Sequence, residues 1–297
     1  MYPVTRFEAL GLTVGTHQLF VALGVLVAAV VVVLESRRRG TWGDEMLVAV
    51  AGGLVGGALG MRASGFLRDP AAVLDAGVAQ VWQYGAKSVL GGLTGAYLGV
   101  VVAKRLIGYR ERTGDVFAPA VAIGMAVGRI GCLLTEAPGR PTSLPWGVVL
   151  TPDQAASIPQ CPSCAAGVPL HPSFGYEIVF HLLAFAALLR LRDRLHRPGA
   201  LLTVYLAGYA AFRFAVEFLR DNEVVAAGLT RGQLYLVALA PLVVWRVAVL
   251  VRDERRHRAP SSERPLAETS VSEATVSEAT VSEAPASETP VSEGTPA

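Results

Sequence analysis

Charged residues lie within long apolar segments of this chain. Arg129 lies inside the apolar segment 115–134, and Glu136 follows seven residues later. Arg213 and Glu217 lie in a later apolar segment, four residues apart, so they share one face of a helix. A charge at the centre of a bilayer costs roughly 2.5–3.5 kcal/mol or more. These residues therefore indicate a functional site, and a structural ion pair that locks two helices together is the alternative.

The type of charge indicates what such a site binds. A guanidinium binds phosphate through paired hydrogen bonds and does not lose its charge. A phosphate at the depth of the lipid headgroups belongs to a phospholipid, so Arg129 and Arg213 are candidates to hold a phospholipid headgroup. The carboxylates would orient the arginines or handle protons, and there are more charges than a single ion-pair lock needs.

Two further stretches bring polar residues to the same region. "LHPSFGYE" carries His171, Tyr176 and Glu177 at the start of the apolar segment 173–190. "FRFAVEFLRDNE" carries Arg220 just beyond the segment that holds the second arginine. The order of the segments places all of these residues toward one side of the membrane.

Seven apolar segments must position these residues. Hydrophobic residues make up 52% of the chain and the mean hydropathy is +0.45, which is high for a soluble protein. A helix needs about 20 mostly apolar residues to cross a bilayer. We therefore predict an all-α polytopic membrane protein with about seven transmembrane helices. Their approximate ranges are 17–34, 44–62, 86–104, 115–134, 173–190, 199–219 and 231–251.

Basic clusters indicate the orientation, because Lys and Arg concentrate in cytoplasmic loops. Such clusters follow the first, third, fifth and seventh segments. This pattern predicts an outer N-terminus, a cytoplasmic C-terminus and a site in the outer leaflet. The clusters contain Arg37, Arg38, Arg39, Lys104, Arg105, Arg110, Arg112, Arg190, Arg192, Arg194, Arg197, Arg252, Arg255, Arg256 and Arg258.

Glycine is concentrated in two of the segments. The second contains "AGGLVGGALG" at 51–60, and the third contains "LGGLTGAYLG" at 90–99. Small residues let helix backbones approach closely within a membrane. We therefore expect these glycines to pack helices rather than to bind a ligand.

The last part of the chain differs from the rest. "VSEATVSEATVSEAP" repeats every five residues without an aromatic side chain, so we predict a disordered acidic tail over 254–297 behind a transmembrane domain over 1–253. From Ser261 onward the tail holds seven glutamates and one arginine, a net charge of −6. Because the whole chain carries +2, the residues before the tail carry +8. This positive charge suits contact with anionic lipid.

The three cysteines fall in two places. Cys161 and Cys164 form a C-x-x-C pair in the loop 135–172, where a small disulfide is expected outside the membrane. Redox catalysis is the alternative, and a zinc site needs more ligands than this loop clearly offers. Cys132 lies inside the fourth segment and is expected to be a small buried residue.

Three motifs carry a resemblance to a known family. "GRIGCLLTEAPGRPTSLPWGVV" at 128–149 resembles a pattern in which G-R-I-G-N-F leads to a glutamate, a Gly-Arg turn and L-P-W. "HPSFGYE" at 171–177 resembles H-P-S-Q-L-Y-E. "GYAAFRFAVEFLRDNE" at 208–223, followed by "GLTRGQ", resembles a sixth-helix motif and the start of a last helix. These are motifs of prolipoprotein diacylglyceryl transferases, and the resemblance covers most of residues 10–250.

The resemblance implies an activity. Members of that family transfer the diacylglyceryl group of phosphatidylglycerol to the lipobox cysteine thiol of a preprolipoprotein, which forms a thioether and releases glycerol phosphate. The implied location is the bacterial cytoplasmic (inner) membrane. The implied partners are phosphatidylglycerol, preprolipoprotein signal peptides and membrane lipids, with no nucleic acid. No metal or soluble cofactor is implied.

The motifs also imply roles for individual residues. The family's two essential arginines correspond to Arg129 and Arg213, and its signature glycine corresponds to Gly139. Together with the residues above, the expected catalytic residues are Arg129, Arg213, His171 and Glu136. The expected substrate-binding residues are Arg129, Arg213, Glu217, Glu177, Tyr176, Gly139, Arg220 and His17.

The sequence departs from the family pattern at three positions. Leu90 stands where the family has a third-helix histidine that is usually proposed as the base. Cys132 replaces the signature asparagine, and His17 aligns with a tyrosine of the first helix. A leucine cannot accept a proton, so His17 and His171 are candidate bases. Alternatively the arginines and the leaving phosphate suffice, because stabilising developing charge is often the largest catalytic term.

Two other functions compete with the transferase. The loss of the histidine motivates a non-catalytic relative that binds phospholipid or lipoprotein precursors. A transporter is disfavoured, because the charges gather on one side and no inverted repeat is evident.

Overall fold

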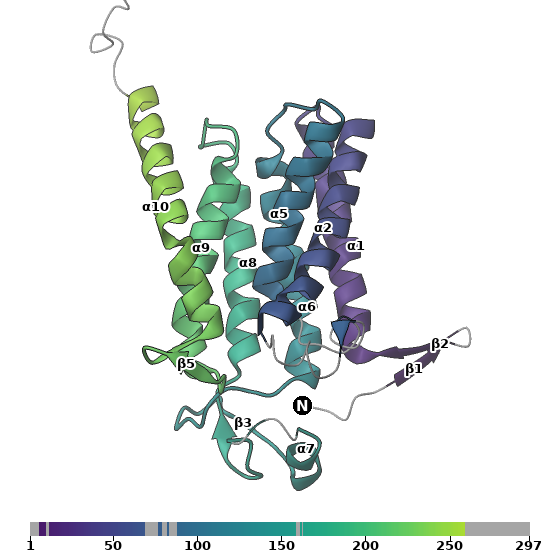
Figure 1. Cartoon of the computed structure of the whole chain (residues 1–297), viewed down its shortest axis with the longest axis vertical. Coiled ribbons are helices and arrows are strands. Elements are labelled where there is room, and N and C mark those ends of the chain that lie inside the picture. The colour runs from purple at the N-terminus through teal and green to yellow at the C-terminus, as the bar shows by residue number, and fades with distance from the viewer. Residues whose placement is uncertain are drawn as a thin grey trace, which may run out of the picture. The chain divides into compact units, whose positions relative to one another are not determined.

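Seven long helices form the body of the protein in the computed structural model, and Figure 1 shows them running side by side. Each is long and apolar enough to cross a membrane, which confirms the predicted all-α polytopic fold. The helices are α1 (Thr16–Arg38), α2 (Asp44–Arg68), α5 (Val89–Leu106), α6 (Gly114–Thr135), α8 (Ser173–Leu191), α9 (Ala200–Val216) and α10 (Arg231–Arg258). The structure describes residues 6–9, 12–68, 77–78, 82, 88–158, 161 and 163–258.

Large apolar side chains are exposed along several of these helices. Leu26 of α1, Leu183 of α8 and Val244 of α10 are 61%, 66% and 66% exposed. A water-soluble protein rarely leaves so much apolar surface uncovered. By contrast, half of the apolar stretch of α6 is buried, the largest share among the seven helices described. We therefore take α6 as the central helix and expect lipid to cover the exposed side chains.

Glycines hold α2 against α5. A Cβ added at Gly56 would lie 2.3 Å from the carbonyl oxygen of Gly95, and one added at Gly99 would lie 2.1 Å from that of Gly52. No real Cβ fits at such distances, so the two backbones touch because these residues lack a side chain. The two glycine-rich segments thus pack helices, as their composition predicts.

α1 packs against α6 in the same way. A Cβ added at Gly24 would lie 2.6 Å from the carbonyl oxygen of Gly124. One added at Gly131 would lie 3.0 Å from the Cβ of Phe20 and 3.2 Å from the Cα of His17. This contact brings the first turn of α1 beside the last turns of α6.

α6, α8 and α9 also pack together. The carboxylate of Asp115 accepts the backbone N–H groups of Gly199 at 2.8 Å and Leu201 at 2.9 Å, and so caps the start of α9. Their shared apolar cluster consists of Ala118, Ala122, Leu188, Leu201 and Tyr205.

Short strands and one short helix gather at one end of the long helices (Figure 1). β3 (Val148–Val149) pairs with β4 (Pro169–Leu170), and α7 (Pro152–Ala156) lies between them in the chain. β5 (Val224–Ala226) pairs with β6 (Leu229–Thr230) after the short 3-10 turn Glu217–Leu219. The long loop after α6 therefore has local structure that the sequence does not predict.

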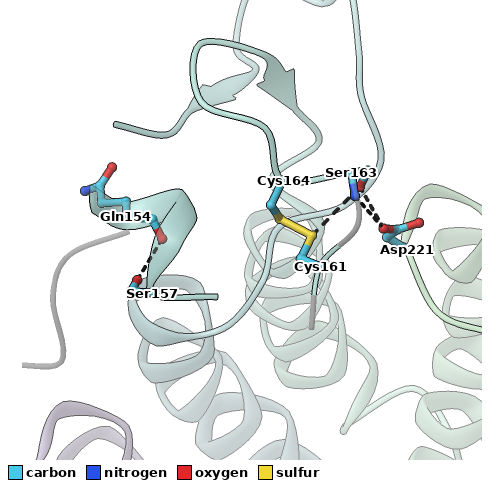
Figure 2. Close-up of a disulfide and its surroundings, with 6 residues drawn as sticks. All are labelled: Gln154, Ser157, Cys161, Ser163, Cys164 and Asp221. Atoms are coloured by element: carbon cyan, nitrogen blue, oxygen red, sulfur yellow. Dashed lines mark hydrogen bonds between the residues drawn. A yellow bond between two sulfur atoms is a disulfide. The ribbon is translucent and has the colours of Figure 1, made fainter. Parts of the chain in front are cut away.

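A disulfide closes part of this loop, as predicted. Cys161 and Cys164 are bonded, and Figure 2 shows Ser163 beside the disulfide, with its hydrogen bonds to Asp221 as dashed lines. The backbone N–H and the hydroxyl of Ser163 donate to Asp221 Oδ2 at 3.3 and 2.7 Å. Asp221 directly follows Arg220, so the disulfide turn anchors the chain next to that arginine.

Both ends of the described chain differ from the predicted segments. β1 (Arg6–Ala9) pairs with β2 (Leu12–Gly15) as a hairpin before α1, which was not predicted. α10 continues to Arg258, beyond residue 253 where the transmembrane domain was predicted to end. The rest of the predicted tail, 259–297, lies outside the described residues.

Candidate active site

A buried guanidinium lies near the end of α6. Arg129 is only 6% exposed although its helix is apolar. Its Nη2 lies 2.7 Å from Glu177 Oε2 on α8 and 3.4 Å from the Tyr209 hydroxyl on α9. Three helices therefore meet at this ion pair.

Glu177 is fully buried, and both of its carboxylate oxygens are engaged. Oε2 accepts from Arg129 and also from the Tyr209 hydroxyl at 3.4 Å. Oε1 accepts from Arg220 Nη1 at 3.1 Å. A carboxylate away from water needs such partners, because an unpaired buried charge is very costly. Glu177 thus joins two arginines that come from different parts of the chain.

A second ion pair continues the cluster. Arg213 and Glu217 pair across one helical turn, as their spacing predicts. Glu217 also accepts hydrogen bonds at 2.8 Å from the Thr230 hydroxyl and from the Asn222 side-chain amide. Arg220 Nε lies 4.0 Å from Glu217 Oε2, so Arg220 connects this pair to the first carboxylate.

The whole cluster, which we call the arginine network, consists of Arg129, Glu177, Arg220, Glu217 and Arg213. Three arginines face two glutamates, so the network carries an excess positive charge. Burial and repulsion from Arg213 lower the pKa of the Arg220 guanidinium from its ordinary value. An anion bound here would offset that repulsion, and phosphate is the anion that guanidinium geometry fits well.

An aromatic ring borders two of these arginines. The guanidinium carbons of Arg220 and Arg129 lie 4.2 and 5.6 Å from the ring centre of Phe174, where the ring face attracts cations. Phe174 also borders a largely apolar cavity of about 320 Å³. The cavity is lined by Leu133, Leu134, Pro138, Val148, Pro172, Ser173 and Phe174.

Gly139 allows the loop after α6 to pass close to the network. Its N–H donates to the carbonyl of His171 at 2.7 Å, and the next N–H, of Arg140, donates to the carbonyl of Leu219 at 2.8 Å. A Cβ added at Gly139 would lie 2.1 Å from that Leu219 oxygen and 3.0 Å from the His171 Cβ. Gly139 also forms a β-bridge with Arg220. A side chain at this position would push the loop away from the arginine.

His171 belongs to a separate aromatic cluster. Its Nδ1 lies 3.1 Å from the hydroxyl of Tyr176, which also accepts from Trp146 Nε1 at 3.0 Å. Within the described part of the chain, no hydrogen bond joins the His171 side chain to the arginine network.

Another group lies beside Arg129. His17 Nε2 lies 3.4 Å from Glu136 Oε1 and 3.6 Å from Cys132 Sγ. Arg129 Nη1 lies 3.7 Å from the same sulfur. Burial opposes ionisation of Glu136, but hydrogen bonds with His17 and Cys132 outweigh it and lower the pKa of the carboxyl. Cys132 is buried, as predicted.

The motifs around these residues match a family model. The model described as prolipoprotein diacylglyceryl transferase matches residues 5–251. The chain belongs to the prolipoprotein diacylglyceryl transferase family. This agrees with the resemblance carried by the three motifs.

Individual relatives are similar over most of their length. The phosphatidylglycerol–prolipoprotein diacylglyceryl transferase of Cupriavidus necator is 33% identical over 239 residues, which cover 75% of this chain and 79% of that protein. The protein of the same name from Methylococcus capsulatus is 33% identical over 215 residues, covering 71% and 75%. That from Bordetella bronchiseptica is 32% identical over 200 residues, covering 64% and 68%.

The structure brings most of the predicted site residues together. Arg129 and Arg213 pair with different carboxylates, Glu177 and Glu217 respectively. Glu136 was expected to orient the arginines or to handle protons, and the structure pairs it with His17. The sequence could not assign the partners of Arg129 and Glu136, because each of these two pairs joins distant parts of the chain.

Two neighbours of the network were missed in the sequence. Tyr209 lies four residues before the second arginine of α9, and His181 lies four residues after the glutamate of α8. Both are thus one helical turn from a site residue, and that spacing is the signal that could have found them. Leu90 lies in the first turn of α5 and offers no proton acceptor.

Proposed function

We propose that this protein transfers the diacylglyceryl group of phosphatidylglycerol to the lipobox cysteine thiol of a prolipoprotein, forming a thioether and releasing glycerol phosphate. The observation that carries the proposal is the arginine network with its excess positive charge. Relatives named for this reaction cover three quarters of the chain at about a third identity. A network that binds phosphate beside lipid is what such a reaction needs.

The arginines hold the phosphate. Arg129 and Arg213 donate hydrogen bonds to its oxygens, and Arg220 adds charge from the loop. Glu177 and Glu217 keep the guanidinium groups in place between reactions. Because negative charge develops on the phosphate as it leaves, fixed cations stabilise the transition state more than the ground state.

The other parts of the lipid have neighbours in this site as well. The apolar cavity beside Phe174 accepts a part of the diacylglyceryl group or the apolar lipobox side chains. Tyr176 and His171 lie on the loop side of the site, and Gly139 keeps that loop close to Arg220. These assignments follow from proximity and chemistry.

A thiol must lose its proton before it attacks. Leu90 supplies no base, whereas His17 lies between two polar groups beside Arg129. His171 is bonded to the Tyr176 hydroxyl instead. We therefore propose that the group of side chains around His17 promotes loss of the thiol proton.

The location follows from the charge pattern and the substrates. The protein spans the bacterial cytoplasmic membrane several times, with its N-terminus outside and its C-terminus in the cytoplasm. The site then faces the outer leaflet, where secreted precursors arrive. The disulfide between Cys161 and Cys164 supports this side, because disulfides persist in oxidising compartments.

Complementation tests the proposal. A bacterium depleted of its own prolipoprotein diacylglyceryl transferase receives the full-length chain, and lipoprotein processing is followed on gels. The wild type restores processing, Arg129→Ala does not, and Arg231→Ala does, because Arg231 pairs with Glu223 at an exposed position. A wild-type protein that is inserted in the membrane but restores nothing would favour the non-catalytic relative.

A further inference from the structure

Three side chains of the kind that bind transition metals meet beside the arginine network. His17 Nε2, Cys132 Sγ and a carboxylate oxygen of Glu136 all lie within 4.8 Å of one another. We propose that these residues bind a zinc ion and that its fourth position takes the substrate thiol. The role of the thiol rests on the proposed transferase function, whereas the metal site stands on its own geometry.

The distances fit the spacing of ligands around a tetrahedral ion. Zinc binds nitrogen or oxygen at about 2.0–2.2 Å and sulfur at about 2.3 Å, so tetrahedral ligands stand roughly 3.4 Å apart for nitrogen and oxygen and roughly 3.6 Å for nitrogen and sulfur. The separations are 3.4 Å between His17 Nε2 and Glu136 Oε1 and 3.6 Å between His17 Nε2 and Cys132 Sγ.

The fold holds the three ligands in place. Cys132 lies in the last turn of α6, and Glu136 directly follows the helix, with its backbone N–H bonded to the carbonyl of Cys132. His17 comes from the first turn of α1, and Gly131 lets that turn approach α6 closely. Two helices that pack through glycine therefore bring the ligands together without a loop rearrangement.

The ligand types select zinc over the hard cations. Thiolate and imidazole suit zinc, whereas magnesium and calcium prefer oxygen ligands. One thiolate and one carboxylate also balance the two positive charges of the ion, which favours binding in a region of low dielectric. Catalytic zinc sites use three protein ligands and keep one position open, whereas structural sites use four protein ligands.

The open position is accessible to a substrate. The side chains of His17 and Glu136 are 40% and 44% exposed, while Cys132 is buried behind them. Arg129 Nη1 lies 3.7 Å from the Cys132 sulfur and so joins the proposed metal site to the phosphate-binding arginines. A thiol and a phospholipid phosphate bound at the two sites would be neighbours.

The chemistry then needs no histidine at position 90. A thiol that binds a zinc ion loses its proton, here to water. The thiolate sulfur forms a bond to the glycerol carbon of the lipid, and the bond from that carbon to the phosphate oxygen breaks. Its electron pair leaves with the oxygen, so glycerol phosphate departs as an anion. No oxidant or reductant is consumed.

Cobalt binding tests the site directly. The full chain is purified through a tag without histidine, stripped with a chelator in detergent, and titrated with Co²⁺. We expect one equivalent to bind with a thiolate-to-cobalt charge-transfer band in the near ultraviolet. Cys132→Ser removes the band, and Glu136→Gln weakens binding at least roughly tenfold. His171→Gln is the matched histidine control, and it keeps the band because His171 lies in the separate aromatic cluster.

A lipobox peptide distinguishes the metal site from its proposed role. The peptide should intensify the cobalt–thiolate band, and a peptide with serine in place of the lipobox cysteine should not. Turnover should fall after chelation and return with Zn²⁺. Full turnover by stripped protein that binds no cobalt would overturn the metal site and leave the transferase intact. If cobalt binds but its band does not respond to the peptide, the proposal that the substrate thiol occupies the fourth position is wrong.

Discussion

Replacing Glu177 by glutamine tests whether the arginine network holds the site together. The buried carboxylate accepts from Arg129 at 2.7 Å, from Arg220 at 3.1 Å and from Tyr209 at 3.4 Å. Glutamine has nearly the same shape, but it has no charge and turns N–H donors toward a guanidinium. Two buried arginines then lose their shared counter-charge, and breaking such a pair costs about 3–5 kcal/mol.

The assay measures the free energy of unfolding in lipid–detergent micelles. Glu223→Gln is the matched control, because Glu223 also pairs with an arginine, Arg231, at 2.9 Å. That pair is exposed, at 69% for the glutamate, so its loss costs about 0–1 kcal/mol. An equal loss of unfolding free energy in the two variants, or no loss in Glu177→Gln, would refute the reasoning that a buried ion pair stabilises this protein more than an exposed one.

Three further predictions concern packing and loop position. Gly139→Ala should lower turnover at least roughly tenfold, because the added Cβ would lie 2.1 Å from a carbonyl oxygen. Gly128→Ala is its control and should leave the fold intact, because a Cβ added there has no neighbouring atom within 4 Å. Gly95→Ala should cost about 1–3 kcal/mol of unfolding free energy through helix separation. Gly92→Ala is its control, since the nearest atom to that Cβ lies at an ordinary 3.5 Å. Equal melting temperatures for the two variants would contradict the close-packing argument. Ser163→Ala removes the hydroxyl's hydrogen bond to the Asp221 carboxylate but keeps the one from the backbone N–H. It should lower turnover more than folding stability, which parallel rate and melting measurements would reveal.

Local patterns in the sequence predicted the helices well. Each of the seven helices coincides with an apolar run, because spanning a bilayer fixes both length and hydropathy. The pairing of Arg213 with Glu217 was also predictable, since residues four apart meet on one helix face. The disulfide between Cys161 and Cys164 was predictable because the C-x-x-C pair lies in a loop that the charge pattern places outside the membrane.

Contacts between distant segments were not predictable from one sequence. Arg129 could have paired with any acidic residue on its side of the membrane, and only the packing of α6 on α8 selects Glu177. His17 and Cys132 are separated by 115 residues, and glycine contacts between α1 and α6 bring them together. The hairpin before α1 does alternate polar and apolar residues, but each of its strands is only four residues long, so the pattern is too short to predict a strand. The composition of a segment therefore predicts a helix, but not its neighbour.

The most direct test of the central claim is the mass of the product. Purified full-length protein is incubated with phosphatidylglycerol and a lipobox peptide in mixed micelles, and the peptide is analysed by mass spectrometry. The account predicts one diacylglyceryl group on the cysteine and one glycerol phosphate released per modified peptide, with neither formed by Arg129→Ala or Arg213→Ala. An unmodified peptide with the wild type, or a peptide that carries the lipid together with its phosphate, would contradict it.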